Sequence, residues 1–322
     1  MQMTVANKKQ NGTIGVQREW RKSQFVKTMK RDFWLYVFLA PAVIYLIVFK
    51  YIPMLGTVIA FKNYSIGKGI IDSAWVGFDN FVRLFKTPNF YVILRNTIML
   101  SLLNIIFGFP APIILSLLIN EVRHKWYKRG IQTIMYIPHF VSWVILGGIV
   151  IQLFSMEGPI SMMMHNMFGI EPTSYISHTG SWIAIYVASG IWKEVGWNTV
   201  IYLAAISSVD AELYEAAKID GANKFRQMIH VTIPCIASTI VTLLILRMGS
   251  ILAVGFEQIY MLQNPAVNDV ADVISTYEYR VGLEQRQYSL TTALGLFKGV
   301  VGLILVLGTN YIAKKLGEDG IW

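Results

Sequence analysis

The sequence predicts an all-α integral membrane protein with six membrane-crossing helices. Of its 322 residues, 54% are hydrophobic and only 15% are charged, which is too apolar for an ordinary soluble domain. Six apolar segments are each near the length needed to cross the roughly 30 Å hydrocarbon core of a bilayer. We place these segments at residues 33–60, 95–119, 131–154, 182–206, 233–256 and 289–312.

The first 32 residues are polar and contain eight Lys and Arg. This stretch is too long and too charged for the start of a cleavable signal peptide, and no Ala-x-Ala-like site follows the first apolar run. We therefore expect a basic cytoplasmic tail at 1–32, followed by a transmembrane domain at 33–322. Residues 18–31 fit either an interfacial basic helix or a disordered tail.

Prolines are expected to bend the first three spans. Pro53 lies in the last turns of the first, Pro110 and Pro112 near the middle of the second, and Pro138 in the third. A proline removes a backbone N–H and kinks a helix. The carbonyls that it frees need partners within the protein, so we expect these bends to line the bundle interior.

Loop charges predict the orientation. With the N-terminus inside, the cytoplasmic tails and loops contain 17 Lys and Arg, whereas the outer loops 61–94, 155–181 and 257–288 contain six. This asymmetry follows the positive-inside rule. It places both termini and the loop 207–232 in the cytoplasm.

Composition and motifs exclude several other classes. The single cysteine, Cys235, excludes an intrachain disulfide and a cysteine-based zinc cluster. The net charge of +9 comes from basic residues beside apolar spans, which indicates membrane orientation rather than nucleic-acid binding. No phosphate loop, Ser-His-Asp arrangement or metal cluster occurs, so we expect a non-enzymatic chain that binds no cofactor.

A polar island separates the fourth and fifth apolar segments. Ser208 is a candidate N-cap for a short helix, whose residues Leu213, Ala216 and Ala217 share a small apolar face. Gly221 can take the left-handed conformation that ends such a helix. A second short helix, with Ala222, Phe225 and Ile229 on one side, would run to Pro234. The pattern fits either a docking surface for a partner or an amphipathic connector.

The island also carries a motif. Glu215-Ala216-Ala217, Gly221 and Val231-Thr-Ile-Pro234 resemble the EAA motif of ABC-importer permeases. Similarity to oligosaccharide-uptake permeases extends over nearly the whole chain, through Phe49–Pro53, Phe107–Pro112, Tyr136–Trp143 and the tail from Ala271 to Gly317. Within that group, the chain most resembles permeases for polysaccharide-derived or complex sugars, such as alginate-type oligosaccharide importers.

The resemblance implies the type I ABC importer (MetI-like) permease fold, with cytoplasmic coupling helices between spans four and five. In this family the coupling helix docks in a cleft of the ATPase subunit. The positions that match the motif, or flank it, are Tyr214, Glu215, Ala216, Ala217, Asp220, Gly221, Ala222, Phe225 and Pro234.

The resemblance also implies partners. These are a second homologous permease in a heterodimer, two ATPase subunits that bind ATP and magnesium, and an extracytoplasmic sugar-binding protein. The expected location is the bacterial cytoplasmic (inner) membrane, where transport would proceed by alternating access. A secondary sugar symporter and a membrane scaffold are the alternatives. Inverted repeats and broken helices at the midplane would mark the symporter, and neither pattern is evident.

Four charged residues lie within or near apolar spans: Lys193, Glu194, Arg247 and Lys298. A charge at mid-bilayer costs roughly 2.5–3.5 kcal/mol, so such groups usually face a cavity or a partner. Arg247 is the natural partner of Glu194 in an ion pair. Direct contact of Arg247 with the sugar is the alternative, and Lys193 and Arg247 would both tolerate an acidic sugar such as a uronate oligomer.

The resemblance further marks a candidate sugar path. Maltose-type permeases hold sugar with a stretch at the same distance before the EAA motif, which here falls on Trp192, Lys193, Glu194 and Trp197. Aromatic rings suit sugar faces and amides suit hydroxyls, so Asn198 and Tyr202 are further candidates. Helix packing is the alternative role for the aromatic residues. The outer loop 257–288 is polar, and it fits either a docking site for a binding protein or a solvated connector.

Overall fold

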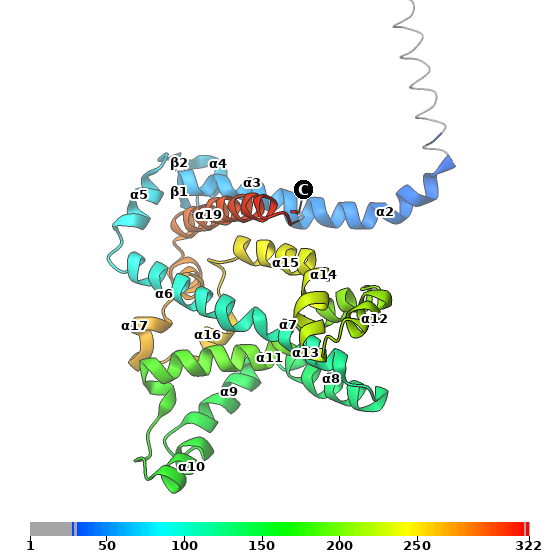
Figure 1. Cartoon of the computed structure of the whole chain (residues 1–322). Helices are drawn as coiled ribbons and strands as arrows, with labels where there is room; N and C mark the ends of the chain where they lie inside the picture. The colour runs from blue at the N-terminus through cyan, green and yellow to red at the C-terminus, as the bar shows by residue number, and fades with distance from the viewer. Residues whose placement is uncertain (1–27, 29–30, 319, 322) are drawn as a thin grey trace, which may run out of the picture. The chain divides into compact units, whose positions relative to one another are not determined.

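The computed structural model of the chain describes residues 28, 31–318 and 320–321. It divides into two compact units, of which one ends at Val58 and the other begins at Ile59. Both consist mainly of helices (Figure 1). The expected basic tail, with the candidate interfacial helix at 18–31, falls almost entirely outside the described residues and stays a prediction.

One continuous apolar helix forms most of the described part of the first unit and continues to Phe61, just past the boundary. It runs 29 residues from Phe33 to Phe61 through α2 (Phe33–Leu46), the π-helix η1 (Ile47–Tyr51), α3 (Ile52–Leu55) and the 3-10 helix η2 (Gly56–Phe61). None of the residues of α2, η1 and α3 is buried. A helix that is apolar all round needs a lipid or protein environment, which agrees with the span predicted at 33–60.

The second unit begins with a small hairpin that the sequence did not predict. Strand β1 (Lys62–Ser65) pairs antiparallel with β2 (Ser73–Trp75), with the short helix α4 (Gly69–Asp72) in the connection. The buried amide of Asn80, on α5 (Asp79–Lys86), donates hydrogen bonds to the carbonyls of Ala60 at 2.9 Å and Lys62 at 3.0 Å. These bonds fix the hairpin onto α5.

The second and third predicted spans differ in how they bend. Helices α6 (Phe90–Leu103) and α7 (Pro110–Glu121) are continuous through the π-helix η3 (Asn104–Gly108). The third span, predicted as one helix at 131–154, is instead two helices, α8 (Lys125–Phe140) and α9 (Trp143–Phe154). The break is not at Pro138, which stays inside α8. It falls at Ser142, which caps α9 with its side chain.

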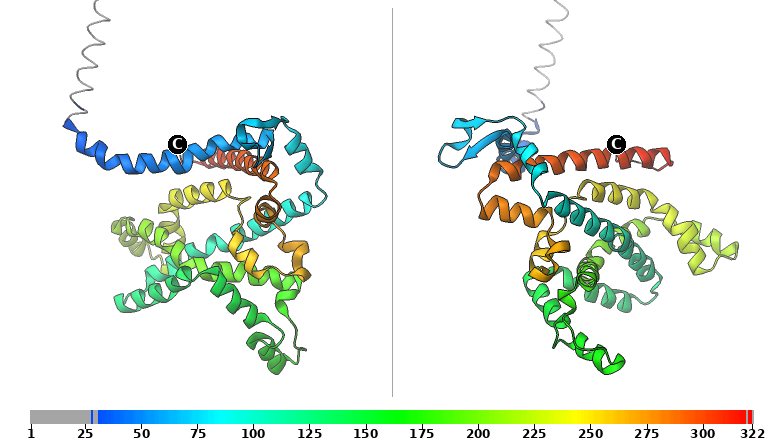
Figure 2. Two further views of the ribbon diagram at one scale, coloured as in Figure 1. Left: turned by 180° about the vertical axis from the view of Figure 1, so that it is seen from behind. Right: turned by 90° about the vertical axis from the view of Figure 1, so that its left-hand side faces the viewer.

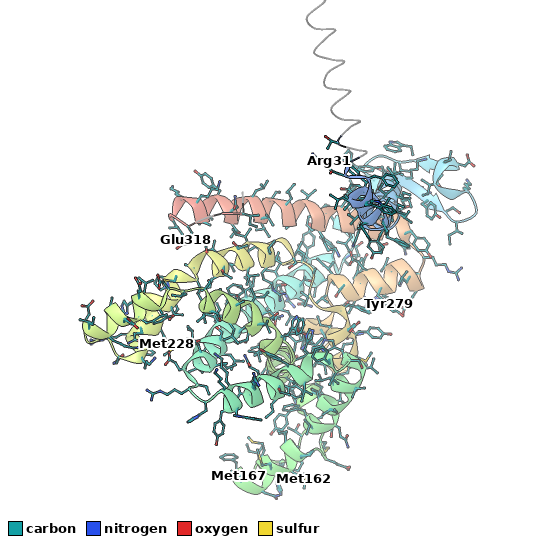
Figure 3. The ribbon with its side chains drawn as sticks, turned by 90° about the vertical axis from the view of Figure 1, so that its right-hand side faces the viewer. Arg31, Met162, Met167, Met228, Tyr279 and Glu318 are labelled. Carbon is teal, nitrogen blue, oxygen red and sulfur yellow. The ribbon has the colours of Figure 1, made fainter. Side chains whose placement is uncertain are left out.

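Helix α11 (Thr179–Ser207) is the longest of the second unit and packs against α7 and α8. It agrees in position with the helix expected at 182–206, and its role as a membrane span stays a prediction. The 3-10 helix η4 (Tyr175–Ser177) precedes it, and α10 (Pro159–Phe168) follows α9. Met162 and Met167 of α10 lie at an extremity of the second unit, away from α15 and α19 (Figures 2 and 3).

The fifth predicted span, at 233–256, is wrong at both ends. Short helices α12 (Ala211–Ile219) and α13 (Lys224–Gln227), the π-helix η5 (Met228–Thr232) and α14 (Ile233–Cys235) precede α15 (Ala237–Gly249). The segment Lys224–Cys235 meets α15 at a bend of 63°. Helix α15 ends at Gly249, whose carbonyl lies so close to Gly302 of α19 (Tyr288–Lys315) that a Cβ at Gly302 would clash with it.

Three π-helical turns share one cause. Helices η1, η3 and η5 end two residues before Pro53, Pro110 and Pro234 respectively. Because proline has no N–H, the carbonyl four residues earlier loses its usual partner. The residue just before each proline donates instead to a carbonyl five residues back, as Phe109 N does to Asn104 O at 3.0 Å. The distortions predicted at Pro53 and Pro110 are therefore present as wide turns in helices that continue, whereas Pro138 lies within α8 and produces no such turn.

Segment 257–288, expected to be a polar loop, is folded. It contains α16 (Phe256–Leu262), the 3-10 helix η6 (Pro265–Val267), α17 (Asn268–Ala271), α18 (Ile274–Tyr277) and the π-helix η7 (Glu278–Glu284). We call residues 256–284 the helical cap. Ile259, Val267 and Ile274 are fully buried there, so the expectation of a solvated connector is wrong.

The described residues contain four helices long and apolar enough to cross a membrane, or five if the bent pair at Lys224–Gly249 counts as one span. The four are Phe33–Phe61, Phe90–Glu121, Trp143–Phe168 and Tyr288–Lys315. Helix α11, with 29 residues, is long enough, but Lys193, Glu194 and Asn198 make its centre polar. The structure thus confirms a helical membrane protein and leaves the count of six spans a prediction.

Candidate functional site

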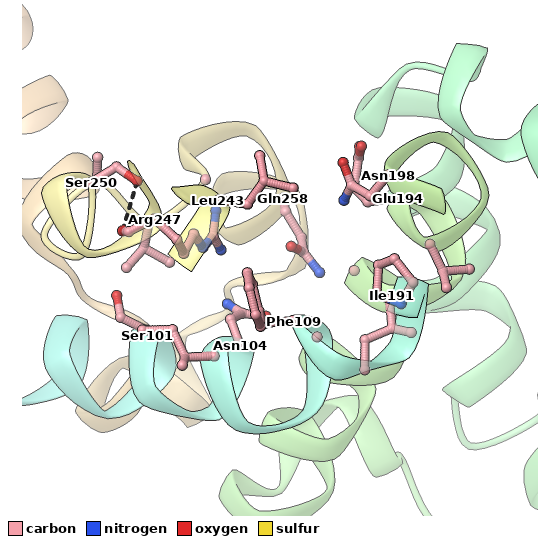
Figure 4. A pocket seen from close by; sticks show the side chains of 18 of the residues that line it. Ser101, Asn104, Phe109, Ile191, Glu194, Asn198, Leu243, Arg247, Ser250 and Gln258 are labelled. Atoms are coloured by element: carbon pink, nitrogen blue, oxygen red, sulfur yellow. Dashed lines mark hydrogen bonds between the residues drawn. The ribbon is translucent and has the colours of Figure 1, made fainter. Parts of the chain in front are cut away.

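A polar pocket of about 420 Å³ lies among the long helices of the second unit. It lies between the α6–α7 helix, α11, α15 and the start of α16 (Figure 4). Its polar lining side chains are those of Ser101, Asn104, Tyr186, Glu194, Asn198, Tyr202, Arg247, Ser250 and Gln258. A pocket of this size with a few converging polar groups is the usual form of a small-molecule site.

Glu194 and Arg247 do not pair. Their side chains lie on different sides of the pocket, Glu194 on α11 and Arg247 on α15 (Figure 4). Within the described part of the chain, Arg247 has no ion-pair partner, whereas Glu194 Oε2 lies 2.9 Å from His139 Nδ1. The predicted Glu194–Arg247 pair is therefore wrong. Arg247, in the last turn of α15, is exposed to the pocket as an uncompensated cation, which is rare for a charge within an apolar segment.

His139 is held from two directions. Its ring stacks on Trp197, with ring centroids 4.6 Å apart and planes 2° from parallel, while Nδ1 contacts Glu194. Phe140 packs edge-on against the same indole. The aromatic contacts therefore place His139, and His139 in turn places the carboxylate of Glu194 at the pocket wall.

Lys193 is buried and makes hydrogen bonds between two helices. It is 7% exposed, and its ammonium group donates to the carbonyls of His139 at 2.8 Å and Val141 at 2.6 Å. These carbonyls belong to the end of α8, where the helix stops and its C=O groups need donors. Next to it on α11, Gly196 lies against the Met135 carbonyl so closely that a Cβ would clash. Lys193 thus joins α8 to α11 and does not line the pocket.

Of the other residues predicted for the sugar path, some line the pocket and some do not. Asn198 and Tyr202 line the pocket, and Tyr202 is only 3% exposed. Trp192 and Trp197 do not line it, although each is about half exposed on α11. Lys298, the fourth intramembrane charge, forms an ion pair with Glu278 of the helical cap at 2.6 Å. Of the charged candidates, only Glu194 and Arg247 face the pocket.

Two amide side chains at the pocket, those of Asn104 and Gln258, were not predicted from the sequence. Asn104 donates from Nδ2 to the Tyr186 hydroxyl at 3.0 Å, and Gln258 donates from Nε2 to the Tyr186 carbonyl at 2.7 Å. Asn104 follows an apolar run in the second span, and an amide at such a depth is the signal that could have identified it. Gln258 had no such signal, because its segment reads as a loop.

The polar island 207–232 folds as two short helices, as predicted, with one correction. The N-cap of α12 is Asp210, whose carboxylate accepts from Glu212 N at 3.0 Å, and not Ser208. Gly221 has φ +78°, which confirms its left-handed conformation. Ala222 N donates to Ala217 O and Gly221 N donates to Lys218 O, which is the Schellman arrangement for ending a helix.

The two short helices contact the rest of the second unit on one side only. The Tyr214 hydroxyl is 3.0 Å from Thr232 Oγ1, and Lys224 forms an ion pair with Glu121 at the end of α7. The other side presents apolar side chains to the surroundings, including Ile219 at 87% and Phe225 at 65% exposure. We call residues 211–235 the coupling element. Figure 3 shows it, at Met228, on the opposite side of the second unit from Tyr279 of the cap.

The predicted motif residues divide between these two sides. Glu215, Ala216, Asp220, Gly221 and Phe225 are exposed, as is Pro234 near the bend before α15, whereas Tyr214, Ala217 and Ala222 are half-buried. Among the described residues, no cluster of three or more His, Cys, Asp and Glu side chains could hold a metal ion. The features that stand out are therefore a polar pocket between helices and an exposed apolar surface at one end.

Comparison with known proteins gives consistent relatives. Residues 108–318 match the family described as binding-protein-dependent transport system inner membrane component. The chain is 50% identical over 299 residues to Protein LplB of Bacillus subtilis (strain 168), which covers 92% of this chain and 94% of that protein. It is 46% identical over 305 residues to the polygalacturonan/rhamnogalacturonan transport system permease protein YteP of the same organism, with 95% of each covered.

A solved structure agrees in fold. The chain superimposes with a TM-score of 0.83 and 42% identity on a chain of a bacterial alginate ABC transporter in complex with an alginate pentasaccharide-bound periplasmic protein, covering 92% of this chain and 99% of that one. The relatives are transport permeases, which favours neither a secondary symporter nor a scaffold. The chain belongs to the family of inner membrane components of binding-protein-dependent transport systems.

Proposed function

We propose that this permease forms part of an ATP-driven importer for an acidic oligosaccharide, which passes through the pocket between α6–α7, α11 and α15. The observation that carries the proposal is Arg247, a cation that faces the pocket without an ion-pair partner in the described chain. A uronate carboxylate could pair with its planar guanidinium through two hydrogen bonds. Relatives named for polygalacturonan and alginate transport support this class of cargo.

The other pocket groups suit a sugar. Asn104, Asn198 and Gln258 each have an amide that can donate to or accept from hydroxyls. Glu194 would repel an acidic cargo if its charge were uncompensated. Its contact with His139 draws the carboxylate towards α8, and this leaves the side of the pocket near Arg247 for the anion.

The coupling element supplies the link to ATP hydrolysis. Its exposed apolar residues, Ile219 and Phe225, would dock on an ATPase subunit, with Glu215 facing a cationic site there. ATP and magnesium would be bound by that subunit, and a second homologous permease would close the pathway as a heterodimer. An extracytoplasmic binding protein would deliver the sugar on the side of the helical cap.

Uptake by the reconstituted complex tests the cargo. Arg247→Gln should leave the complex assembled and thermally stable, because the side chain is exposed to the pocket, but should reduce uptake of trigalacturonate at least about tenfold. Arg123→Gln, which removes an exposed cation from the loop after α7, is the matched control and should transport normally. Normal trigalacturonate uptake by Arg247→Gln would overturn the proposed role of this pocket.

Cysteine labelling tests the orientation. After Cys235→Ser removes the native thiol, cysteine introduced at position 125 or 218 should react only from the cytoplasmic side, and at 165 or 269 only from outside. The reason is the charge asymmetry of 17 to six between the two sets of loops. Reaction of position 218 from outside would reverse the orientation and exclude ATPase docking at the coupling element.

A further inference from the structure

A second pocket lies in the same unit, on the side of the helical cap. It has a volume of about 470 Å³ and is formed by α5, the start of α6, the cap and the start of α19. Three cationic side chains line it, those of Arg83, Lys86 and Arg280. None of its described lining residues is acidic. The pocket is therefore electropositive, and it is separate from the pocket that contains Arg247.

The three cations are not equivalent. Arg280 is held by Asp272, with nitrogen-to-oxygen distances of 2.7 and 3.2 Å. This hydrogen bonding, together with the nearby charge of Glu284, raises the pKa of Arg280 and offsets much of its charge. Arg83 and Lys86, both exposed on α5, have no ion-pair partner in the described ranges. The charge available to a ligand is therefore chiefly that of Arg83 and Lys86.

The rest of the pocket suits a carbohydrate rather than a bare anion. Three amides, which can each donate and accept hydrogen bonds, stand beside the cations: Asn89, Gln285 and Gln287. Below them lies an apolar floor of Ile93, Val281 and Leu290, all buried. A pyranose ring has hydroxyls around its edge and C–H groups on its faces, so this combination matches a sugar that carries a carboxylate.

The distribution of charge makes the cluster unusual. The loops 61–94, 155–181 and 257–288 contain six Lys and Arg in total, in accordance with the positive-inside rule. Three of these six line this one pocket. Cations that topology disfavours on this side are thus concentrated where they surround a cavity, which indicates a role in binding an anion.

We propose that this pocket is a binding site for the carboxylate of an acidic saccharide, which it holds before the sugar enters the membrane. The inference rests on the proposed function, because it assumes that the cargo is anionic and arrives on the cap side. Arg83 and Lys86 bind the carboxylate, and the amides bind the hydroxyls next to it. The pocket raises the local concentration of cargo at the entrance and does not take part in translocation.

The test uses the complete complex, with partner permease and ATPases, in nanodiscs of phosphatidylcholine. All binding measurements are made with Arg247→Gln, so that the central pocket does not dominate the signal. Calorimetry should show that Arg83→Gln/Lys86→Gln weakens trigalacturonate binding at least about tenfold, with an unchanged melting temperature. The matched control is Lys68→Gln, which removes an exposed cation from the hairpin and should bind normally.

Four outcomes would overturn the inference. These are unchanged binding in the double variant, an equal loss in Lys68→Gln, an equal loss for neutral maltotriose, and loss of trigalacturonate binding in discs of anionic phosphatidylglycerol. The last would mean that the pocket takes a lipid phosphate. Uptake distinguishes failure of this inference from failure of the proposed function. If the complex with Arg247 intact imports no trigalacturonate, the proposed function is wrong. If it imports trigalacturonate normally but Arg83→Gln/Lys86→Gln does not weaken binding, only the entrance site is wrong.

Discussion

The coupling element and the helical cap are both built from short helices of mixed polarity, but their apolar residues differ in burial. Both connect long helices with short helical segments of mixed polarity. In the cap, Ile259 and Ile274 are fully buried and form part of the core. In the coupling element, Ile219 is 87% and Phe225 65% exposed. Apolar residues in a segment of mixed polarity can therefore either pack into the protein's own core or remain exposed at the surface. Only their burial in the structure distinguishes the two cases.

The helices on which these segments sit explain the difference. The cap packs against α6, α9, α11 and α19, so its apolar side chains have neighbours on several sides. The coupling element follows the end of α11. It packs through Met228 and Ile233 against one small buried cluster, formed by Leu117, Ile206 and Ile236 outside it. Its other face has nothing to pack on within the described chain. The segment that is incomplete by itself is the one that contains the residues resembling the EAA motif.

The largest effect should come from the turn of the coupling element. Gly221→Pro forces a negative φ where the native φ is +78°, so the Schellman turn cannot form and the two short helices cannot keep their angle. We expect sugar-stimulated ATPase activity to fall to the background of the complex. Activity is measured after reconstitution with the ATPase and the binding protein.

Gly221→Ala is the matched control for this variant. A Cβ at this position meets no atom within 4 Å, so alanine adds only the left-handed backbone strain of about 1–2 kcal/mol. Its ATPase activity should fall only partly. Full stimulation in Gly221→Pro would show that the turn does not transmit coupling.

In the helical cap the corresponding change should destabilise the protein. Ile259→Ala removes a fully buried side chain that packs in the main core cluster with Trp182 and Leu262. The expected loss is about 2–5 kcal/mol, from transfer and cavity terms together. Thermal unfolding of the purified complex measures it. A melting temperature equal to that of the unsubstituted complex would mean that the cap is a loose connector after all.

Two of the long helices could be predicted from the sequence, because polar residues on either side of a mostly apolar run mark where the helix begins and ends. This is why α11 and α19 lie within a few residues of the segments predicted at 182–206 and 289–312. Gly221 could be predicted because glycine readily takes the left-handed conformation in which a helix ends. Each of these features depends on local chemistry alone.

The cap could not be predicted, because its apolar residues are interleaved with Asn and Asp in helices of only four to seven residues. Such short pieces show no clear helical period. The partner of Glu194 could not be predicted either. Arg247 is the obvious cation by composition, but Lys193 fixes the end of α8 next to α11, and this places His139 within reach of Glu194. Partners set by helix packing are not visible in one chain's sequence.

A polar contact within the cap should have a moderate effect. Thr276 is buried, with 3% of its surface exposed. Its hydroxyl donates to Asp272 Oδ1 at 2.8 Å and accepts from Val273 N at 3.0 Å. Thr276→Val keeps the shape and leaves a buried N–H without its acceptor, which should cost about 1–3 kcal/mol. Chemical denaturation of the complex would show the loss as a lower midpoint. Thr179→Val, at an exposed hydroxyl near the cap, should leave the midpoint unchanged and serves as control.

The smallest effect on stability should come from Ile219→Ala, and this variant tests the comparison most directly. It removes the same side chain as Ile259→Ala, but at a position that is 87% exposed. In the isolated permease we expect a change in unfolding free energy within about 0.5 kcal/mol, because no packed contact is lost.

In the assembled transporter we expect weaker association with the ATPase, because buried apolar anchors carry much of the binding energy of an interface. The first quantity is measured as the melting temperature of the isolated permease, and the second by co-purification of the ATPase with the assembled transporter. If Ile219→Ala lowers the stability of the isolated permease as much as Ile259→Ala does, the coupling element is part of the core. If it changes neither quantity, the apolar surface that we assign to ATPase docking has no partner there, and the two regions differ in burial but not in function.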